Sequence, residues 1–186
     1  ARETAEPACR MLNLPCHIEP WAHEVEEKRL TPFPDGELKS VSVVQNTYYR
    51  ENGAIELSYD KAFAAPGFNT SQMDQATARI EAGGRDFLER LGYKEENGVY
   101  KILRANEDKV ALFCHTVMGR IWISRLLHIP IHLMWAGFQM THTGVTIIEF
   151  KNNENGVTAP YCRAFSDMSH LYAEGLDMRH DNTIEV

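Results

Sequence analysis

The chain has 186 residues, of which 44% are hydrophobic and 24% are charged, and its formal net charge is −7. This length and composition predict a single globular domain with one large core. The acidic balance argues against a general binder of nucleic acid or of acidic membranes, because phosphate backbones need a basic protein face. A small anionic substrate stays compatible with it, since a local pocket can be positive on an acidic protein.

The N-terminal part of the chain combines one regular helix with an irregular segment. Apolar residues at intervals of three and four predict an amphipathic helix over residues 3–12, and a short strand is expected at 17–20. Residues 31–69 are broken by prolines and glycines, which predicts loops and short pieces. Long loop-rich inserts in compact domains are often functional, so we expect residues 31–69 to form an irregular insert or lid.

The middle of the chain carries the clearest helical pattern. A helix is predicted over residues 70–91, with Gly92 as its stop. The Gly83–Gly84 pair inside it costs about 1 kcal/mol per glycine relative to alanine where solvent-exposed. Close packing against a neighbouring element is one reason to keep such a pair. A small hairpin is predicted over residues 93–103, around an Asn-Gly turn.

The last third predicts a strand, two helices and a hairpin. Residues Val110 to Cys114 form a continuous apolar run, which is typical of a strand buried on both faces. Helices are predicted over 117–127 and 133–138, and a hairpin joins strands at 144–150 and 157–165. Helices that alternate with strands predict an α/β fold, with an antiparallel hairpin late in the chain.

The four cysteines point to a reduced, cytoplasmic chain. They form no C-x-x-C pair and do not cluster with histidines at zinc spacing. His128 and His132 have metal-ligand spacing for a helix, but Pro130 lies between them and breaks that geometry, so we expect no metal. No apolar run approaches the roughly 20 residues that span a bilayer, and we expect no signal peptide.

One hypothesis for the chemistry is a cysteine phosphatase loop. Cys114 and Arg120 have the C-x5-R spacing in which backbone N–H groups and the arginine surround a phosphate. Such a loop turns tightly around the anion and calls for glycines, whereas Val117 and Met118 stand in its middle. Cys114 and His115 cannot share a proton in a regular strand, because neighbouring side chains point to opposite faces. The cysteine hypothesis is therefore kept as a minor alternative, and Cys114 is expected to be a buried strand residue.

A second hypothesis places the chemistry on His115. This residue follows the predicted strand and precedes the predicted helix. Ligands gather at the carboxyl ends of strands in open α/β sheets, and helix N-termini there offer free N–H groups to an anion. A histidine at this point can bind phosphate, and its charge is adjustable near neutral pH. Taken alone, a single histidine fits a structural or exposed role at least as well.

The surrounding sequence adds a resemblance. The stretch ALFCHTVMGRIWISRLLHIPIHLMWAGFQMTHTGVTIIEF closely resembles the second half of the histidine phosphatase superfamily, also called the phosphoglycerate-mutase-like family. The N-terminal ARETAEPACRMLNLP is similar to the family stretch S-P-L-x-R-A-x-x-T-A, which opens a helix. PWAHEV resembles the segment that carries the family's acidic proton donor, and Glu24 takes that position. The resemblance implies a three-layer sandwich with a mostly parallel central sheet.

The sequence also departs from the family pattern at positions that bear on its activity. The family's first strand ends in R-H-G, whose histidine is the nucleophile, and no R-H-G occurs in this sequence. Ala1 matches the alanine that follows the family's second phosphate-binding arginine. We therefore expect residues 1–186 to form one histidine-phosphatase-like domain that lacks the first strand and helix, and we expect this chain alone to be inactive. Thr116 and Val117 follow His115 where the family often has glycine, which bears on the shape of the pocket.

The resemblance implies a phosphomonoester hydrolase or a phosphomutase that works through a phosphohistidine intermediate. His115 and Thr116 would then bind the phosphate, and His115 would stabilise charge in the transition state. Glu24 would protonate the leaving group. The expected partner is a phosphorylated small molecule, with no cofactor, no nucleic acid and no membrane, and a homodimer is also considered. The alternative from another class is a non-catalytic anion-binding or regulatory module of the same fold.

Overall fold

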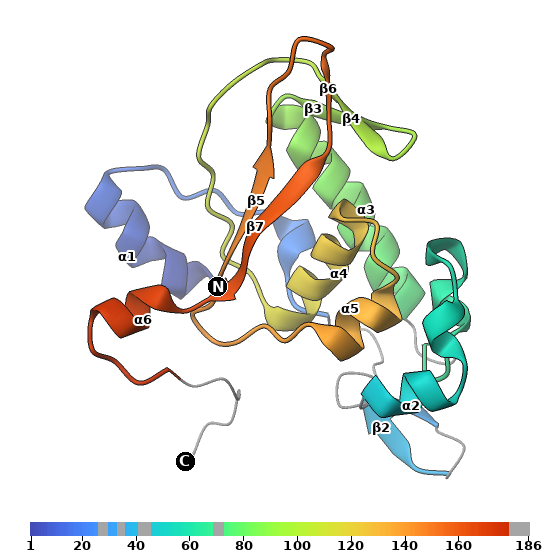
Figure 1. The fold of residues 1–186 in the computed structure, drawn as a ribbon. Helices are drawn as coiled ribbons and strands as arrows, with labels where there is room; N and C mark the ends of the chain where they lie inside the picture. Colours follow the sequence, from blue (N-terminus) through green and yellow to red (C-terminus); the bar gives the residue numbers. More distant parts are fainter. Residues whose placement is uncertain (26–29, 33–35, 41–45, 69–72, 179–186) are drawn as a thin grey trace.

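The computed structural model describes residues 1–25, 30–32, 36–40, 46–68 and 73–178 (Figure 1). The helices in these residues are α1 (Arg2–Leu12), α2 (Asn46–Glu51), α3 (Met73–Arg90), α4 (Thr116–Leu126), α5 (Ile131–Gly137) and α6 (Ser169–Ala173). The same residues also form the 3₁₀ turns η1 (Pro20–Ala22), η3 (Ala54–Glu56) and η4 (Tyr59–Ala64). The strands are β1 (Leu30–Pro32), β2 (Leu38–Ser40), β3 (Tyr93–Glu96), β4 (Val99–Ile102), β5 (Val145–Phe150), β6 (Val157–Thr158) and β7 (Pro160–Asp167).

These strands form three small sheets, and every pairing that the structure describes is antiparallel. The sheets are β1–β2, β3–β4–β6 and β5–β7. The mixture of helices and strands agrees with the predicted α/β class. The predicted parallel central sheet is not formed by the described residues, so the three-layer sandwich is not confirmed.

The segment from Val110 to Cys114 shows where the sheet prediction departs from the structure. Its backbone is not assigned to a strand, and Val110 and Phe113 are 53% and 37% exposed. A buried parallel strand needs hydrogen-bonded neighbours, and no described strand pairs with this segment. The prediction of a strand buried on both faces is therefore wrong for the described structure. Cys114 itself is only partly buried.

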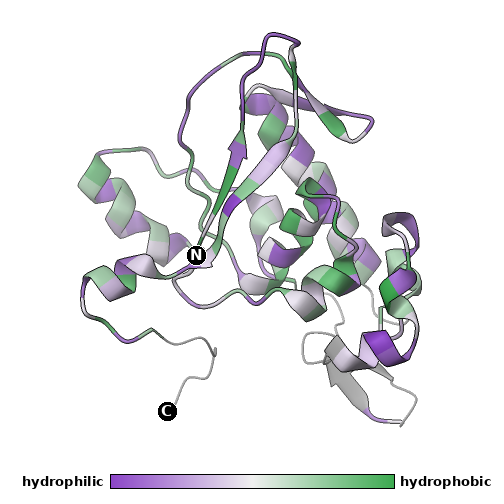
Figure 2. Cartoon of the chain, in the orientation of Figure 1, coloured by the Kyte–Doolittle hydropathy of each residue, from purple (hydrophilic) through white to green (hydrophobic). Residues whose placement is uncertain are grey.

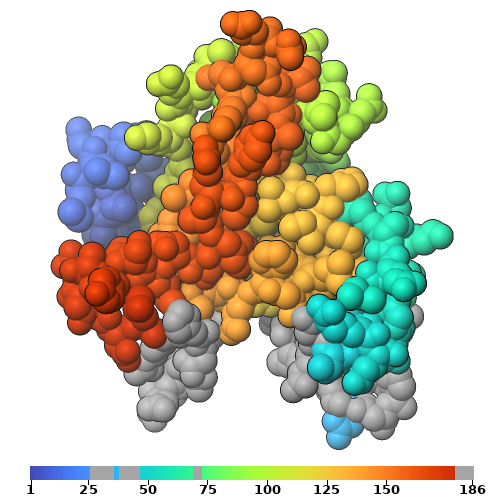
Figure 3. Space-filling model, in the orientation of Figure 1, coloured from blue at the N-terminus to red at the C-terminus, as the bar shows by residue number. Residues whose placement is uncertain are grey.

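Helix α1 confirms the first predicted helix. Asn13 ends it in a left-handed conformation (φ 52°) and donates its N–H to the carbonyl of Arg10. Among its residues only Ala5 is buried, and Met11 is 87% exposed. In Figure 1 this helix lies on one side of the β5–β7 hairpin and α3, α4 and α5 lie on the other, and Figure 3 shows it at an outer edge.

The prediction of a strand at residues 17–20 is wrong. No strand is assigned there, and the 3₁₀ turn η1 begins at Pro20. A proline has no N–H to give to a strand ladder, and its fixed φ suits the first position of such a turn. The segment therefore turns toward α3 instead of extending along a sheet edge.

The local turn signals were predicted correctly. Helix α3 ends before Gly92, which has a φ of 100°. The β3–β4 hairpin turns at Asn97 and Gly98, with φ values of 54° and 80°, as a two-residue turn requires. The β5–β7 pairing confirms the late hairpin, and α4 and α5 confirm the two predicted helices.

The glycine pair in α3 lies against two tryptophans. A Cβ added at Gly83 would be 2.2 Å from the Cβ of Trp21, and one at Gly84 would be 2.6 Å from Nε1 of Trp122. The two indole rings meet edge to face, with centroids 5.2 Å apart. Close packing is therefore the reason for the pair, which lets α3 approach η1 and α4.

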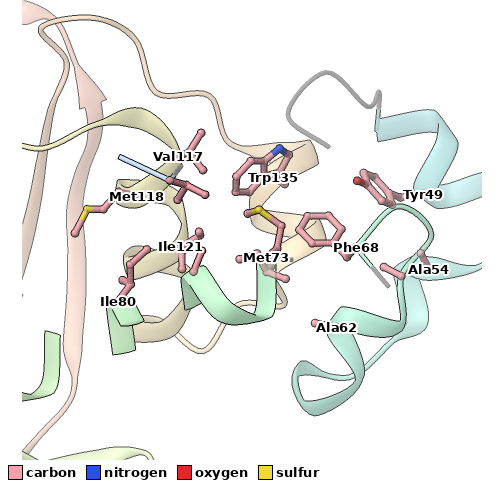
Figure 4. Close-up of a cluster of buried hydrophobic side chains, with 14 of the residues drawn as sticks. Tyr49, Ala54, Ala62, Phe68, Met73, Ile80, Val117, Met118, Ile121 and Trp135 are labelled. Carbon is pink, nitrogen blue, oxygen red and sulfur yellow. The ribbon is translucent and has the colours of Figure 1, made fainter. Parts of the chain in front are cut away.

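The main core lies between α3, α4, α5 and the segment at residues 46–68. Figure 4 shows side chains from all four parts pointing toward one another, and Figure 2 shows that α3 and α4 carry hydrophobic residues on part of their surface only. Tyr49 and Phe68 are 0% and 1% exposed and belong to this cluster. Residues 46–68 of the predicted insert thus contribute to the core, and the action of the insert as a lid stays a prediction. A second cluster holds Phe87, Leu88, Tyr93, Tyr100 and Leu126.

Candidate active site

His115 is the N-cap residue of α4. Its backbone is extended (φ −126°, ψ 163°), and its carbonyl accepts the N–H of Gly119 at 2.8 Å. The side chain is partly buried and makes no capping hydrogen bond to the helix. The first N–H groups of a helix have no partner within it, so the start of α4 must find acceptors elsewhere.

Glu24 supplies those acceptors. Its Oε1 accepts the N–H of Met118 at 3.1 Å, and its Oε2 accepts the N–H of Val117 at 3.4 Å. A negative charge at this position is favoured by the positive end of the helix dipole. The structure therefore brings Glu24 to the helix that starts directly after His115, from 93 and 94 residues away in the sequence.

The segment around Glu24 is held by packing on both sides of it. Ala22 and Val25 are 7% and 2% exposed and belong to the main core. Arg79 of α3 donates to the carbonyl of Trp21 at 2.6 Å. The N–H of Val25 also donates to Oε1 of Glu24 at 2.8 Å. The carboxylate is thus positioned by α3, by the core and by its own backbone, as well as by α4.

Thr116 is the first residue of α4 and is partly buried. Its position places its backbone N–H at the same helix end as those of Val117 and Met118. Val117 and Met118 are 5% and 0% exposed and belong to the main core (Figure 4). The contact of these two residues with Glu24 is therefore made by their N–H groups.

Cys114 and Arg120 are the two residues of the cysteine phosphatase alternative. Burial raises the pKa of the Cys114 thiol and the charge of Glu24 raises it further, whereas a backbone hydrogen bond at His115 lowers it. A nucleophilic cysteine needs the opposite, a lowered pKa. The guanidinium carbon of Arg120 lies over the ring of Trp135, 5.7 Å from its centroid. The structure therefore gives no support to the cysteine alternative.

A group of buried polar side chains beyond α4 was not found from the sequence. Nε of Arg120, the hydroxyl of Tyr49 and Nε1 of Trp135 are buried, with no hydrogen-bond partner among the described residues. Burial lowers the pKa of Arg120 and raises that of Tyr49. His132 is 0% exposed, and burial lowers its pKa while the backbone of Ala54 acts against this shift. No local spacing signals such a cluster, because its members come from α2, α4 and α5.

Neither a metal site nor a membrane span is found in the described part of the chain. No group of three or more histidine, cysteine or acidic side chains is close enough there to hold a metal ion. No described helix has both the length and the apolar character needed to cross a bilayer.

The geometry so far defines an α/β protein with an anion position at a helix N-terminus, beside a histidine. The sequence model of the histidine phosphatase superfamily (branch 1) matches residues 46–162, which include His115 and the whole of α4. A search of the curated proteins and a search of the solved structures each gave no match. Since the matched region is more than half of the chain, this protein belongs to the histidine phosphatase superfamily. Glu24 and α1 lie outside the matched region.

Proposed function

We propose that this chain supplies the His115–Glu24 side of an active site that hydrolyses or transfers the phosphoryl group of a phosphomonoester. Membership of the histidine phosphatase superfamily supports phosphatase or mutase chemistry in general. The observation that carries the proposal is the Glu24 carboxylate on the N–H groups of Val117 and Met118. N–H groups that hold a carboxylate at a helix end can hold phosphoryl oxygens in the same way.

The proposed roles follow from these positions. His115 and the N–H groups of Thr116 and its neighbours bind the phosphoryl oxygens and stabilise the charge that develops on them. Glu24 protonates the leaving alkoxide and then takes a proton from the attacking water. A histidine of an R-H-G segment attacks phosphorus and carries the phosphoryl group between the two steps. The 186 residues contain no such segment, so we expect negligible turnover from this chain alone.

Glu24 and the phosphate compete for the same N–H groups in this proposal. When a phosphoryl group binds, the N–H groups of Val117 and Met118 exchange the carboxylate for phosphoryl oxygens. The exchange releases Glu24 beside the bound substrate, where it is needed as the proton donor. The substrate thereby displaces the group that later acts on it.

The parallel three-layer sandwich is part of the proposal. Residues 110–114 lead directly to His115 and have no strand partner among the described residues. Their free backbone groups are what a strand that ends in R-H-G would pair with, and this pairing would bring the nucleophile to the side of His115. The proposed partner is a phosphorylated small molecule.

The alternative is a non-catalytic anion-binding or regulatory module, which the lack of R-H-G in this sequence favours. Both functions include phosphate binding, and they differ in turnover. The test is p-nitrophenyl phosphate hydrolysis by this chain and by the chain extended with its upstream coding sequence, with phosphohistidine detected after acid-free quenching.

The phosphatase proposal predicts turnover and phosphohistidine in the extended chain, both lost in His115→Ala and kept in the exposed control His170→Ala. An extended chain that contains no R-H-G and has no turnover would establish the module. Robust hydrolysis by the 186 residues alone, abolished by His115→Ala, would contradict the proposed need for R-H-G.

A further inference from the structure

The C-terminal end of α1 folds back on itself and brings two cysteines together. Asn13 adopts the left-handed conformation, and the N–H of Leu14 returns to the carbonyl of Cys9 at 3.0 Å. With the bond from Asn13 to Arg10, these contacts form the reversal that commonly ends helices. The chain that leaves α1 therefore runs back beside its last turns, and Cys16 returns to the side of Cys9.

Both cysteines line the same open depression of about 420 Å³, together with Glu6, Arg10, Asn13, Leu14 and Pro15. Cys9 is partly buried and Cys16 is exposed, and neither is in a disulfide. The neighbouring thiol of Cys16 is the largest of the causes that raise the pKa of Cys9. Solvent and small reagents thus reach both cysteines, which lie at the wall of one depression.

We propose that Cys9 and Cys16 are a modification site, a dithiol that a peroxide converts into an intramolecular disulfide. The proposal rests on the helix reversal and the shared depression, and it is independent of the proposed phosphatase function. An exposed cysteine without a second thiol nearby would be oxidised further to sulfinic acid or would form mixed disulfides. Here a second thiol lines the same depression and can react with the oxidised form of the first.

The chemistry balances in two steps with hydrogen peroxide as the oxidant. The thiolate of the exposed Cys16 attacks one peroxide oxygen, the O–O bond breaks, and a sulfenic acid and hydroxide form. The thiol of Cys9 then loses its proton and attacks the sulfenic sulfur, so that the S–O bond breaks and water leaves. Overall two thiols and one peroxide give one disulfide and two waters, and a dithiol reductant reverses the change.

The disulfide would act on a weakly held element. Ala5 is the only buried residue of α1, so the helix has few core contacts to resist fraying. A bond between Cys9 and Cys16 closes the reversal at its C-terminal end and ties α1 to the segment that continues to η1. We therefore expect the oxidised protein to protect the last turns of α1 from hydrogen exchange, with little change in α3.

The test treats the reduced protein with hydrogen peroxide, blocks the remaining thiols and maps peptides without reductant. The expected result is loss of two hydrogens of mass, one peptide that joins Cys9 to Cys16, and recovery by dithiothreitol. Cys9→Ser and Cys16→Ser should each lose that peptide, whereas Cys162→Ser, which removes an exposed cysteine on β7, should keep it.

Other products would overturn the proposal. Sulfinic acid on Cys16 with Cys9 still reduced, or dimers joined through these cysteines, would show that the pair does not close within one chain. Equal oxidation of Cys162 and Cys16 with no cross-linked peptide would show that exposure alone decides the reaction. Because Cys9 and Cys16 are read out by mass, these outcomes do not depend on any enzymatic activity.

Discussion

Replacing Gly83 by alanine should force η1 away from α3. The new Cβ would lie 2.2 Å from both Cβ and Cγ of Trp21 and 2.9 Å from its Cδ1. Ordinary carbon–carbon contacts are about 3.5–4.0 Å, so the overlap exceeds one ångström. The nearest atom is Cβ of Trp21, which no side-chain rotation moves, and the backbone of η1 has to shift.

Two opposing effects determine how much Gly83→Ala changes the free energy of unfolding. Overpacking of a core typically costs about 1–3 kcal/mol, and alanine regains about 1 kcal/mol over glycine inside a helix. At this degree of overlap the steric term wins, and we expect a loss of about 1–2 kcal/mol in the free energy of unfolding. Because Trp21 lies in the segment that positions Glu24, the shift should also weaken the contacts of Glu24 with Val117 and Met118.

The assay is urea unfolding, with the midpoint and slope compared with those of the wild type. Gly137→Ala is the matched control, since Gly137 also lies in a helix and a Cβ there meets nothing within 4 Å. The control should keep or slightly raise the midpoint. A Gly83→Ala protein as stable as the control variant would refute the claim that close packing of Trp21 explains the glycine.

Three further predictions concern buried groups. Burial and the charge of Glu24 raise the pKa of Cys114, so alkylation of its thiol by iodoacetamide should need a higher pH than alkylation of a free cysteine; rapid labelling at neutral pH would contradict this. Arg120→Met should keep or raise the free energy of unfolding, by about 1 kcal/mol, because it replaces a buried guanidinium whose Nε has no hydrogen-bond partner among the described residues. A loss of more than about 2 kcal/mol would show that Arg120 is paired. Burial lowers the pKa of His132, so at low pH the unfolded chain binds a proton that the folded chain does not bind. The free energy of unfolding should therefore fall as the pH drops below about 6.5. This loss should be smaller in His132→Gln, and an equal loss in both proteins would contradict the prediction.

The sequence predicted well those helices and turns whose ends are determined by residues within or next to them. The end of α3 depends on Gly92, and the β3–β4 turn depends on Asn97 and Gly98, and all three adopt positive φ. The packing role of Gly83 and Gly84 was also accessible, because a glycine pair inside a helix needs a reason beyond the helix. Each of these predictions concerns residues that lie next to one another in the chain.

The errors arise where a distant partner decides the structure. An apolar run such as 110–114 becomes a strand only when another strand pairs with it, and its own residues do not determine that partner. Likewise Tyr49 and Phe68 belong to a segment of loop-like composition, yet they enter the core through contact with each other and with Trp135. Local composition predicted the irregular backbone there and missed the packing.

The candidate site was predicted in its residues and not in its contacts. His115 was singled out by its position before a predicted helix and then by the resemblance to the family, whereas Glu24 came from the resemblance alone. The hydrogen bonds from Val117 and Met118 to Glu24 span more than ninety residues, so no local pattern reports them. The same holds for the buried group around Arg120, which three separate helices assemble.

The central claim is that Glu24 and His115 face one phosphate position at the start of α4. The direct measurement is an NMR titration of the 186-residue chain with inorganic phosphate, which follows the amide signals of Val117 and Met118. We predict that phosphate shifts both signals, that His115→Ala weakens binding, and that Glu24→Ala strengthens it because the competing carboxylate is removed.

Glu3→Ala serves as the control, since Glu3 is an exposed acidic residue of α1 and its removal changes the net charge by the same amount. It should leave the affinity for phosphate close to that of the wild type. Amide signals that do not respond to phosphate, or an affinity that is the same in the wild type, His115→Ala and Glu24→Ala, would contradict the account.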